Sequence, residues 1–146
     1  MSSIISNFSS LMPYLDGSKF DENYDINYSS IGEVKYRSDF IRELCRHKSV
    51  LHIGCTYYVP LIASKISNND WLHGIITECS SFTLGVDIDA QAVLEASKIS
   101  GLNNMVAGDI TSPVKLRDIS ENQFDIAVFG EVVEHIANPV DFLSLF

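Results

Sequence analysis

Four short segments, in each of which an apolar run leads into a glycine or a carboxylate, most strongly constrain how this chain can fold. They are Val50 to Cys55, Leu84 to Asp89, Asn104 to Ile110 and Phe124 to His135. Between them, apolar residues recur at helical spacing over about 36–47, 61–66 and 90–100, and Gly101 is placed to end the last of these helices. Strands that alternate with helices in this way predict a parallel α/β sheet joined by right-handed crossovers.

The strands themselves are predicted at 50–53, 81–86, 105–107 and 124–129. The last has an unbroken apolar interior, which is typical of a strand with both faces covered by helices. In the helix predicted at 90–100, we expect Val93, Leu94 and Ala96 to face the sheet. The order of these elements predicts the nucleotide-binding half of a Rossmann-like domain.

Composition excludes several classes of partner and site. The chain carries a formal net charge of -9, and clustered Lys and Arg are missing, so we expect no nucleic-acid partner. Cys45, Cys55 and Cys79 are odd in number and form no C-x-x-C pair, which argues against a disulfide framework and favours a reducing, cytoplasmic location. No stretch approaches the ~20 apolar residues of a membrane helix, so no membrane association is expected.

The chain is predicted to have two parts. Residues 1–30 are rich in Ser, Asn, Asp and Tyr and show little periodicity, so we expect a polar N-terminal arm. Residues 31–146 are predicted to form the cofactor-binding half of a domain.

Residues that follow the strands are the candidates for a ligand site, because a parallel α/β sheet binds ligands beyond the carboxyl ends of its strands. Gly54 follows the first strand, where a missing side chain lets the backbone approach a ligand, although a structural turn would look the same. Asp87 closes the second strand, where an acid accepts hydrogen bonds from ribose hydroxyls. Asp89 is better placed to cap the following helix.

Taken together, the segments VLHIGC, LGVDID, NMVAGDI and FDIAVFGEVVEHI resemble the successive cofactor-binding motifs of class I S-adenosylmethionine-dependent methyltransferases. The resemblance covers about the last two-thirds of the chain. It implies a sheet in the order 3-2-1-4, flanked by helices. It also implies that S-adenosyl-L-methionine contacts His52, Gly54, Cys55, Asp87, Ile88, Asp109, Ile110, Gly130 and Glu131.

The resemblance assigns roles to several of these residues. Asp109 would contact the adenine amino group while Ile110 packs on the ring, although a solvated turn aspartate would give the same pattern. Gly130 and Glu131 would line the methionine end of the pocket. His135 is the candidate general base for a hydroxyl acceptor.

A divalent cation offers an alternative function for the last motif. Some methyltransferases of this class bind a metal through an E-x-x-E-H pattern, which here would be Glu131, Glu134 and His135. The same letters occur in relatives without a metal, and the further histidine that such a site needs is not identifiable. We therefore expect no metal.

The first motif departs from the usual family pattern. His52 stands where an acid is usual, and Thr56 and Tyr58 replace the second and third glycines. The segment LHIGCT, with the downstream Leu72-His73 pair, is similar to the sequences of a divergent branch of these methyltransferases that is found with polysaccharide-biosynthesis genes. His52 would then hydrogen-bond the methionine portion of the cofactor, or alternatively be a satisfied histidine at the end of a strand.

The resemblance favours an O-methyltransferase that acts on a sugar or another small metabolite. Because the sequence ends at Phe146, only four strands of such a domain are expected, with the C-terminal half missing and the fourth strand exposed. The alternative is a non-catalytic Rossmann-like module that associates with itself or a partner through that edge. A nicotinamide-dependent oxidoreductase is disfavoured, since no G-x-G-x-x-G follows the first strand.

Overall fold

The computed structural model describes residues 12–21, 36–111, 119 and 121–144. The chain divides into two units, Met1–Lys35 and Tyr36–Phe146. In the first unit, helix α2 spans Met12–Leu15 and ends in a turn where Gly17 has a φ of 75°. The predicted end of the polar arm, at residue 30, lies outside the described residues.

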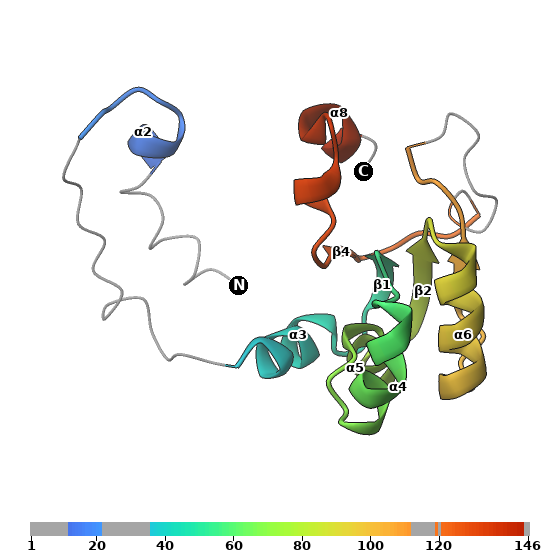
Figure 1. Cartoon of the computed structure of the whole chain (residues 1–146). Helices are drawn as coiled ribbons and strands as arrows, with labels where there is room; N and C mark the ends of the chain where they lie inside the picture. The colour runs from blue at the N-terminus through green and yellow to red at the C-terminus, as the bar shows by residue number, and fades with distance from the viewer. Residues whose placement is uncertain (1–11, 22–35, 112–118, 120, 145–146) are drawn as a thin grey trace. The chain divides into compact units, whose positions relative to one another are not determined.

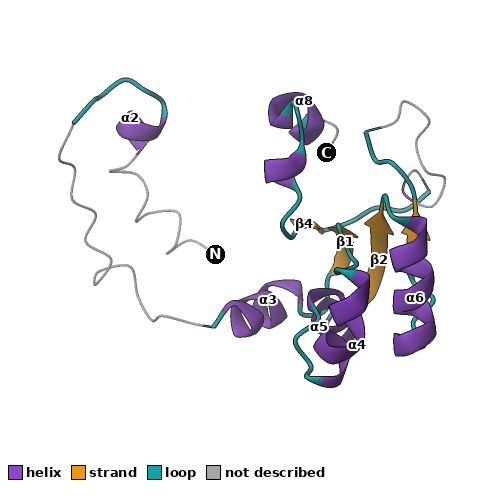
Figure 2. Cartoon of the chain, in the orientation of Figure 1, coloured by secondary structure: helices purple, strands orange, loops and turns teal. Residues whose placement is uncertain are grey.

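The second unit alternates helices and strands (Figures 1 and 2). Its elements are α3 (Arg37–Cys45), β1 (Ser49–Ile53), α4 (Val59–Ser67), α5 (Leu72–Cys79), β2 (Phe82–Asp87), α6 (Ala90–Ser100), β3 (Met105–Ala107), β4 (Ile126–Phe129), the 3-10 helix η2 (Val133–His135) and α8 (Pro139–Leu143). The four strands form one parallel sheet in the order β3-β2-β1-β4. The predicted Rossmann-like α/β fold, with strand order 3-2-1-4, is therefore confirmed.

The register of the sheet brings the strand ends together. Ile53, the last residue of β1, pairs with Val86 of β2 and with Phe129 of β4. Asp87, which ends β2, pairs with Ala107 at the end of β3. Because all four strands run the same way, the segments after β1, β2, β3 and β4 meet at one edge of the sheet.

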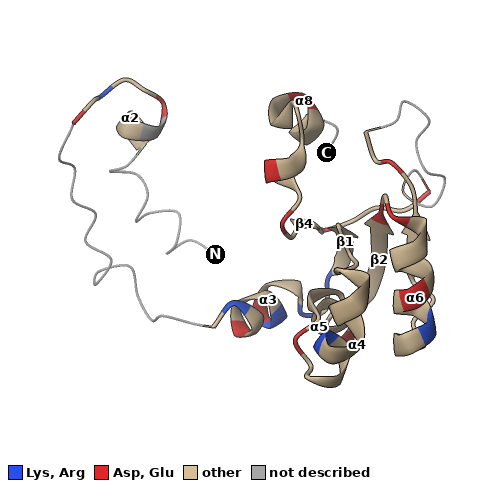
Figure 3. Cartoon of the chain, in the orientation of Figure 1, with Lys and Arg blue, Asp and Glu red and all other residues tan. Residues whose placement is uncertain are grey.

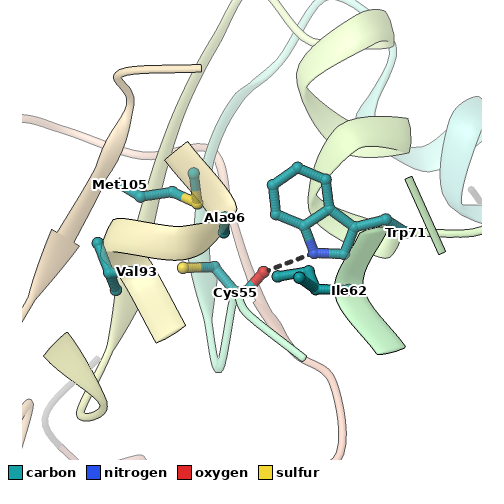
Figure 4. Close-up of a cluster of buried hydrophobic side chains, with 6 residues drawn as sticks. All are labelled: Cys55, Ile62, Trp71, Val93, Ala96 and Met105. Atoms are coloured by element: carbon teal, nitrogen blue, oxygen red, sulfur yellow. Dashed lines mark hydrogen bonds between the residues drawn. The ribbon is translucent and has the colours of Figure 1, made fainter. Parts of the chain in front are cut away.

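Helices α3 to α6 cover one face of the sheet. A buried cluster on this face joins α4, α6, β3 and the loops beside them, and consists of Cys55, Ile62, Trp71, Val93, Ala96 and Met105 (Figure 4). The Trp71 indole N–H donates a 3.1 Å hydrogen bond to the Cys55 carbonyl, so the ring both fills the core and fixes the loop after β1. A second cluster, centred on Cys45, Val50 and Ile76, packs α3 and α5 against β1.

The opposite face of the sheet packs mainly against the segment that follows β4. Leu51, Ile53, Leu84 and Val86 point to this side and form a buried cluster with Phe142 of α8. Side chains of β1 and β2 thus alternate between the two faces, as the period of a strand requires.

Both predicted ends of α6 are confirmed. The Asp89 carboxylate accepts hydrogen bonds from the N–H groups of Gln91 and Ala92, which makes it the N-cap. At the other end Gly101 is the C-cap, with a left-handed φ of 74°. The prediction for Leu94 is wrong, because its side chain is 49% exposed; Ala92 takes its place on the buried side of the helix.

Several elements differ from the prediction. Helix α5 and helix α8 were not expected, and β4 is shorter than the predicted 124–129. All four residues of β4 are only half-buried, although their apolar run is typical of a strand covered on both faces. The reason is its place at an edge of the sheet, where the described residues pair it with β1 alone.

Candidate functional site

A cavity of about 490 Å³ opens at the carboxyl ends of the strands. We call it the first cavity. Its lining is Ile53, Gly54, Thr56, Tyr57, Val86, Asp87, Ile88, Gly108, Asp109, Ile110, Thr111, Gly130, Glu131, Val132, His135 and Ile136. Pockets for small ligands commonly have about this volume and this mixture of apolar walls with a few polar groups.

The turn after β1 depends on Gly54. Its φ of 70° lies in the left-handed region, and its N–H donates a 2.8 Å hydrogen bond to the Val86 carbonyl. A Cβ at this position would lie 2.3 Å from Cγ2 of Val132 and 3.4 Å from the Gly130 carbonyl oxygen. The segments after β1 and β4 can therefore approach this closely only around a glycine.

Asp87 holds the loop that follows this turn. One of its carboxylate oxygens, Oδ2, accepts hydrogen bonds from the Thr56 N–H at 3.0 Å and the Thr56 hydroxyl at 2.6 Å. The other, Oδ1, accepts from the Asp89 N–H at 3.0 Å. Two carboxylate oxygens have about four acceptor sites, so Asp87 can accept a further hydrogen bond from a ligand.

The segment after β3 forms the adjoining wall. Gly108 N–H donates to the Asp87 carbonyl at 2.8 Å, which ties this segment to the end of β2. Asp109 accepts from both the N–H and the hydroxyl of Thr111, and these hydrogen bonds hold the pKa of the Asp109 carboxyl below its ordinary value. The carboxylate therefore stays ionised at the mouth of the cavity, beside the half-buried Ile110.

The segment after β4 closes the cavity on the other side. Glu131 has a φ of 61°, a left-handed conformation that a non-glycine residue rarely adopts and that occurs often at functional sites. Its carboxylate pairs with the Arg37 guanidinium at 3.1 Å, although both side chains are largely exposed. His135 lines the cavity from the end of η2.

Negative charge surrounds the first cavity. Acidic residues lie at or just after the carboxyl ends of β2, β3 and β4, as the red segments beside the end of β2 illustrate (Figure 3), and three of them, Asp87, Asp109 and Glu131, line the cavity. Its described lining includes no Lys or Arg; Arg37 pairs with Glu131 from outside the lining, which leaves the negative charges of Asp87 and Asp109. The cavity therefore attracts a cation and repels a phosphate group.

A second cavity of about 340 Å³ adjoins the first and shares five of its lining residues, Gly54, Thr56, Tyr57, Gly130 and Glu131. Its other lining residues include His52, Arg37 and Leu72. His52 is 1% exposed, and burial, together with the neighbouring His73 and Arg37, lowers its pKa to about 3. His52 is therefore neutral at physiological pH.

The structure thus places the predicted site residues in two groups. The first cavity brings together Gly54, Asp87, Ile88, Asp109, Ile110, Gly130, Glu131 and His135. His52 lines only the second cavity, while the Cys55 side chain lies in the core cluster and lines neither. Burial raises the pKa of the Cys55 thiol, which keeps it protonated and unreactive.

Sequence reasoning did not anticipate several residues of the first cavity. The sequence pattern marks Thr56 only as a replacement for a glycine, whereas its hydroxyl donates a hydrogen bond to Asp87. Val132 and Ile136 line the cavity from the segment after β4. Their spacing in VVEHI carries the only signal, since apolar residues three or four apart share a face of a helical turn.

The described part of the chain shows neither a metal-binding group nor a membrane-spanning helix. No group of three His, Cys, Asp or Glu side chains there is arranged to hold a metal ion. None of the helices described is both long enough and apolar enough to cross a membrane.

Compared with models of known protein families and with curated proteins, the chain matches none.

Proposed function

We propose that the first cavity binds S-adenosyl-L-methionine and that the chain is the cofactor-binding part of a class I methyltransferase. The charge of the cavity carries this proposal. S-adenosylmethionine has a positive sulfonium and no phosphate, whereas a dinucleotide brings two negative phosphates. Arg37 compensates the charge of Glu131, but no lining Lys or Arg compensates Asp87 and Asp109. Their negative charge suits S-adenosylmethionine and disfavours a dinucleotide.

The positions of the polar groups agree with the roles that the resemblance assigns. Asp87 would accept from ribose hydroxyls, and Asp109 from the adenine amino group, because each follows its strand into the same cavity. Ile88, Ile110 and Val132 supply apolar surface for a planar base. Glu131 would face the sulfonium end.

Methyl transfer needs the acceptor nucleophile in line with the sulfonium carbon, so positioning and exclusion of water contribute most of the rate. For a hydroxyl acceptor a base must also remove a proton, and His135 lines the cavity where it could do so. We propose a sugar or other small metabolite as the acceptor, in polysaccharide biosynthesis. This part rests only on the LHIGCT segment and the downstream Leu72-His73 pair.

Calorimetric titration of S-adenosylmethionine into the chain tests the proposal. We expect Asp87→Asn to weaken binding at least tenfold, because a hydrogen bond to a charged group contributes about 1.5–3 kcal/mol. Asp89→Asn is the matched control: it removes the same charge two residues away, where asparagine caps a helix as well as aspartate. Equal losses in both variants would mean that only net charge matters, and no binding to the wild-type chain would contradict the proposal.

A second candidate function rests on β4. Within the described residues this strand pairs only with β1, so its outer edge presents backbone groups to another strand. Such an edge favours an interaction module that associates with itself or with a partner. Sedimentation analysis distinguishes the two: a monomer that binds S-adenosylmethionine supports the first candidate, and an oligomer without binding supports the second.

A further inference from the structure

The second cavity contains an unusual buried atom, the ring nitrogen Nε2 of His52. Among the described residues, it is the buried side-chain nitrogen or oxygen without a hydrogen-bond partner. A buried polar atom left in this state costs about 1–3 kcal/mol, so its retention calls for an explanation. His52 lines the second cavity, and a group bound there would supply the missing partner.

The other ring nitrogen of His52 begins a buried chain of hydrogen bonds. His52 Nδ1 lies 3.2 Å from Nδ1 of His73, and His73 Nε2 lies 3.2 Å from Oδ1 of Asn104. Asn104 Nδ2 in turn donates to the hydroxyl of Thr77 at 3.1 Å. This series of hydrogen bonds connects β1 with α5 and with the loop before β3.

This series of hydrogen bonds, which we call the tautomer relay, determines which nitrogen of each imidazole carries its proton. Because Asn104 donates through Nδ2 to Thr77, its Oδ1 must accept from His73, which places the His73 proton on Nε2. His73 Nδ1 is then an acceptor, so the His52 proton lies on Nδ1. Burial lowers the pKa of His73 to about 4 and that of His52 to about 3, so neither ring holds a second proton near pH 7.

The surroundings of Nε2 contain a cation as well. A Cβ built on Gly130 would lie 3.6 Å from His52 Nε2 and 3.6 Å from Arg37 Nη2, and 2.8 Å from Cδ2 of Leu72, which a bound group would have to displace. One point next to Gly130 is therefore close both to a neutral acceptor and to a guanidinium. An acceptor beside a guanidinium matches the ammonium and carboxylate of an α-amino acid.

We propose that His73 and Asn104 are positioning residues that fix the His52 proton on Nδ1, so that Nε2 accepts a hydrogen bond from a primary ammonium in the second cavity. This inference rests on the proposed function, since the ammonium would belong to the amino-acid part of the same cofactor. Its new content is the tautomer relay and the ligand polarity that the relay selects. With the opposite tautomer, the cavity would present a donor and would select an anion.

Nitrogen NMR of the wild-type chain, labelled with ¹⁵N-histidine, tests the relay without any ligand. We expect long-range ¹H–¹⁵N correlations to show His52 protonated at Nδ1 and bare at Nε2. Asn104→Leu should produce a mixture of tautomers, because the acceptor that holds the His73 proton on Nε2 is then lost. A proton on Nε2 of His52 in the wild-type chain, or an unchanged single tautomer in Asn104→Leu, would overturn the inference.

Calorimetry with two probes tests whether the second cavity selects the amino-acid group of the ligand. S-adenosylhomocysteine carries the amino-acid group, and 5′-methylthioadenosine is the same thioether without it. We expect the wild-type chain to prefer S-adenosylhomocysteine at least tenfold, and His52→Leu to reduce that preference about tenfold. Binding of both probes with the same preference in His52→Leu would overturn the inference and leave the proposed function standing. Binding of neither probe to the wild-type chain would refute the proposed function, and the tautomer measurement would still decide the relay.

Discussion

Lowering the pH from 7 to 5 is expected to reduce the free energy of unfolding by about 4 kcal/mol through two buried histidines. Burial lowers the pKa of His52 to about 3 and that of His73 to about 4, from an ordinary value of 6.5. Between these values the unfolded chain takes up protons that the folded chain excludes. The stability is therefore complete above pH 6.5 and falls with pH below it. Each histidine contributes about 1.4 kcal/mol per pH unit, or about 2 kcal/mol by pH 5.

Urea unfolding at pH 7, 6 and 5 measures this effect. His73→Gln should remove about half of the pH dependence, because one of the two excluded protons is then lost. His47→Asn is the matched control: His47 is exposed after α3, and its φ of 58° suits asparagine. We expect this control to keep the wild-type dependence on pH. A stability that does not change between pH 7 and 5 would contradict the buried, neutral histidine pair.

Gly54→Ala is expected to lower the free energy of unfolding by about 2–5 kcal/mol. Alanine at a φ of 70° costs about 1–2 kcal/mol, and its Cβ would lie 2.3 Å from Val132 Cγ2. Relieving that overlap adds about 1–3 kcal/mol, since overpacked sites shift backbone and side chains. Because Val132 and Gly130 line the first cavity, the same substitution should also weaken binding of S-adenosylmethionine.

Gly101→Ala separates the two contributions. Gly101 has nearly the same backbone conformation, with a φ of 74°, but among the described residues other than its two chain neighbours no atom lies within 4 Å of the position of its Cβ. We therefore expect it to lose about 1–2 kcal/mol, from the left-handed conformation alone, and to bind the cofactor normally. Urea unfolding of both variants provides the comparison. Equal losses would show that the close approach of the β1 and β4 segments is not what requires Gly54.

Much of the fold could be predicted because its signals are local. The apolar run at 50–53 and the Asp89 to Gly101 helix carry their own boundaries. The strand order is not a local signal, and its prediction came from the resemblance to methyltransferases. Helix α5 was missed because its pattern, LHGIITEC, contains a glycine and a buried histidine. Glycine and histidine are weak helix formers, so only the tertiary packing of Ile76 and His73 reveals the helix.

The candidate site was predictable where residues follow strands and unpredictable where distant segments meet. Asp87 and Asp109 could be assigned to one cavity because parallel strands end at one edge. The contact between His52 and His73 joins residues 21 positions apart on a strand and a helix, and no spacing rule relates them. Likewise, the pairing of Thr56 with Asp87 depends on how the loop after β1 folds back.

Backbone-amide NMR during addition of S-adenosylmethionine to the ¹⁵N-labelled chain tests the central claim most directly, because it locates the ligand. We predict that the largest shifts fall on amides that line the first cavity, above all Gly54, Gly108 and Ile110. The amide signals of residues at the amino ends of the strands, on the opposite edge of the sheet, such as Ser49 and Phe82, should not shift. Spectra that stay unchanged at saturating ligand, or shifts confined to that opposite edge, would contradict the assignment of this cavity to the cofactor.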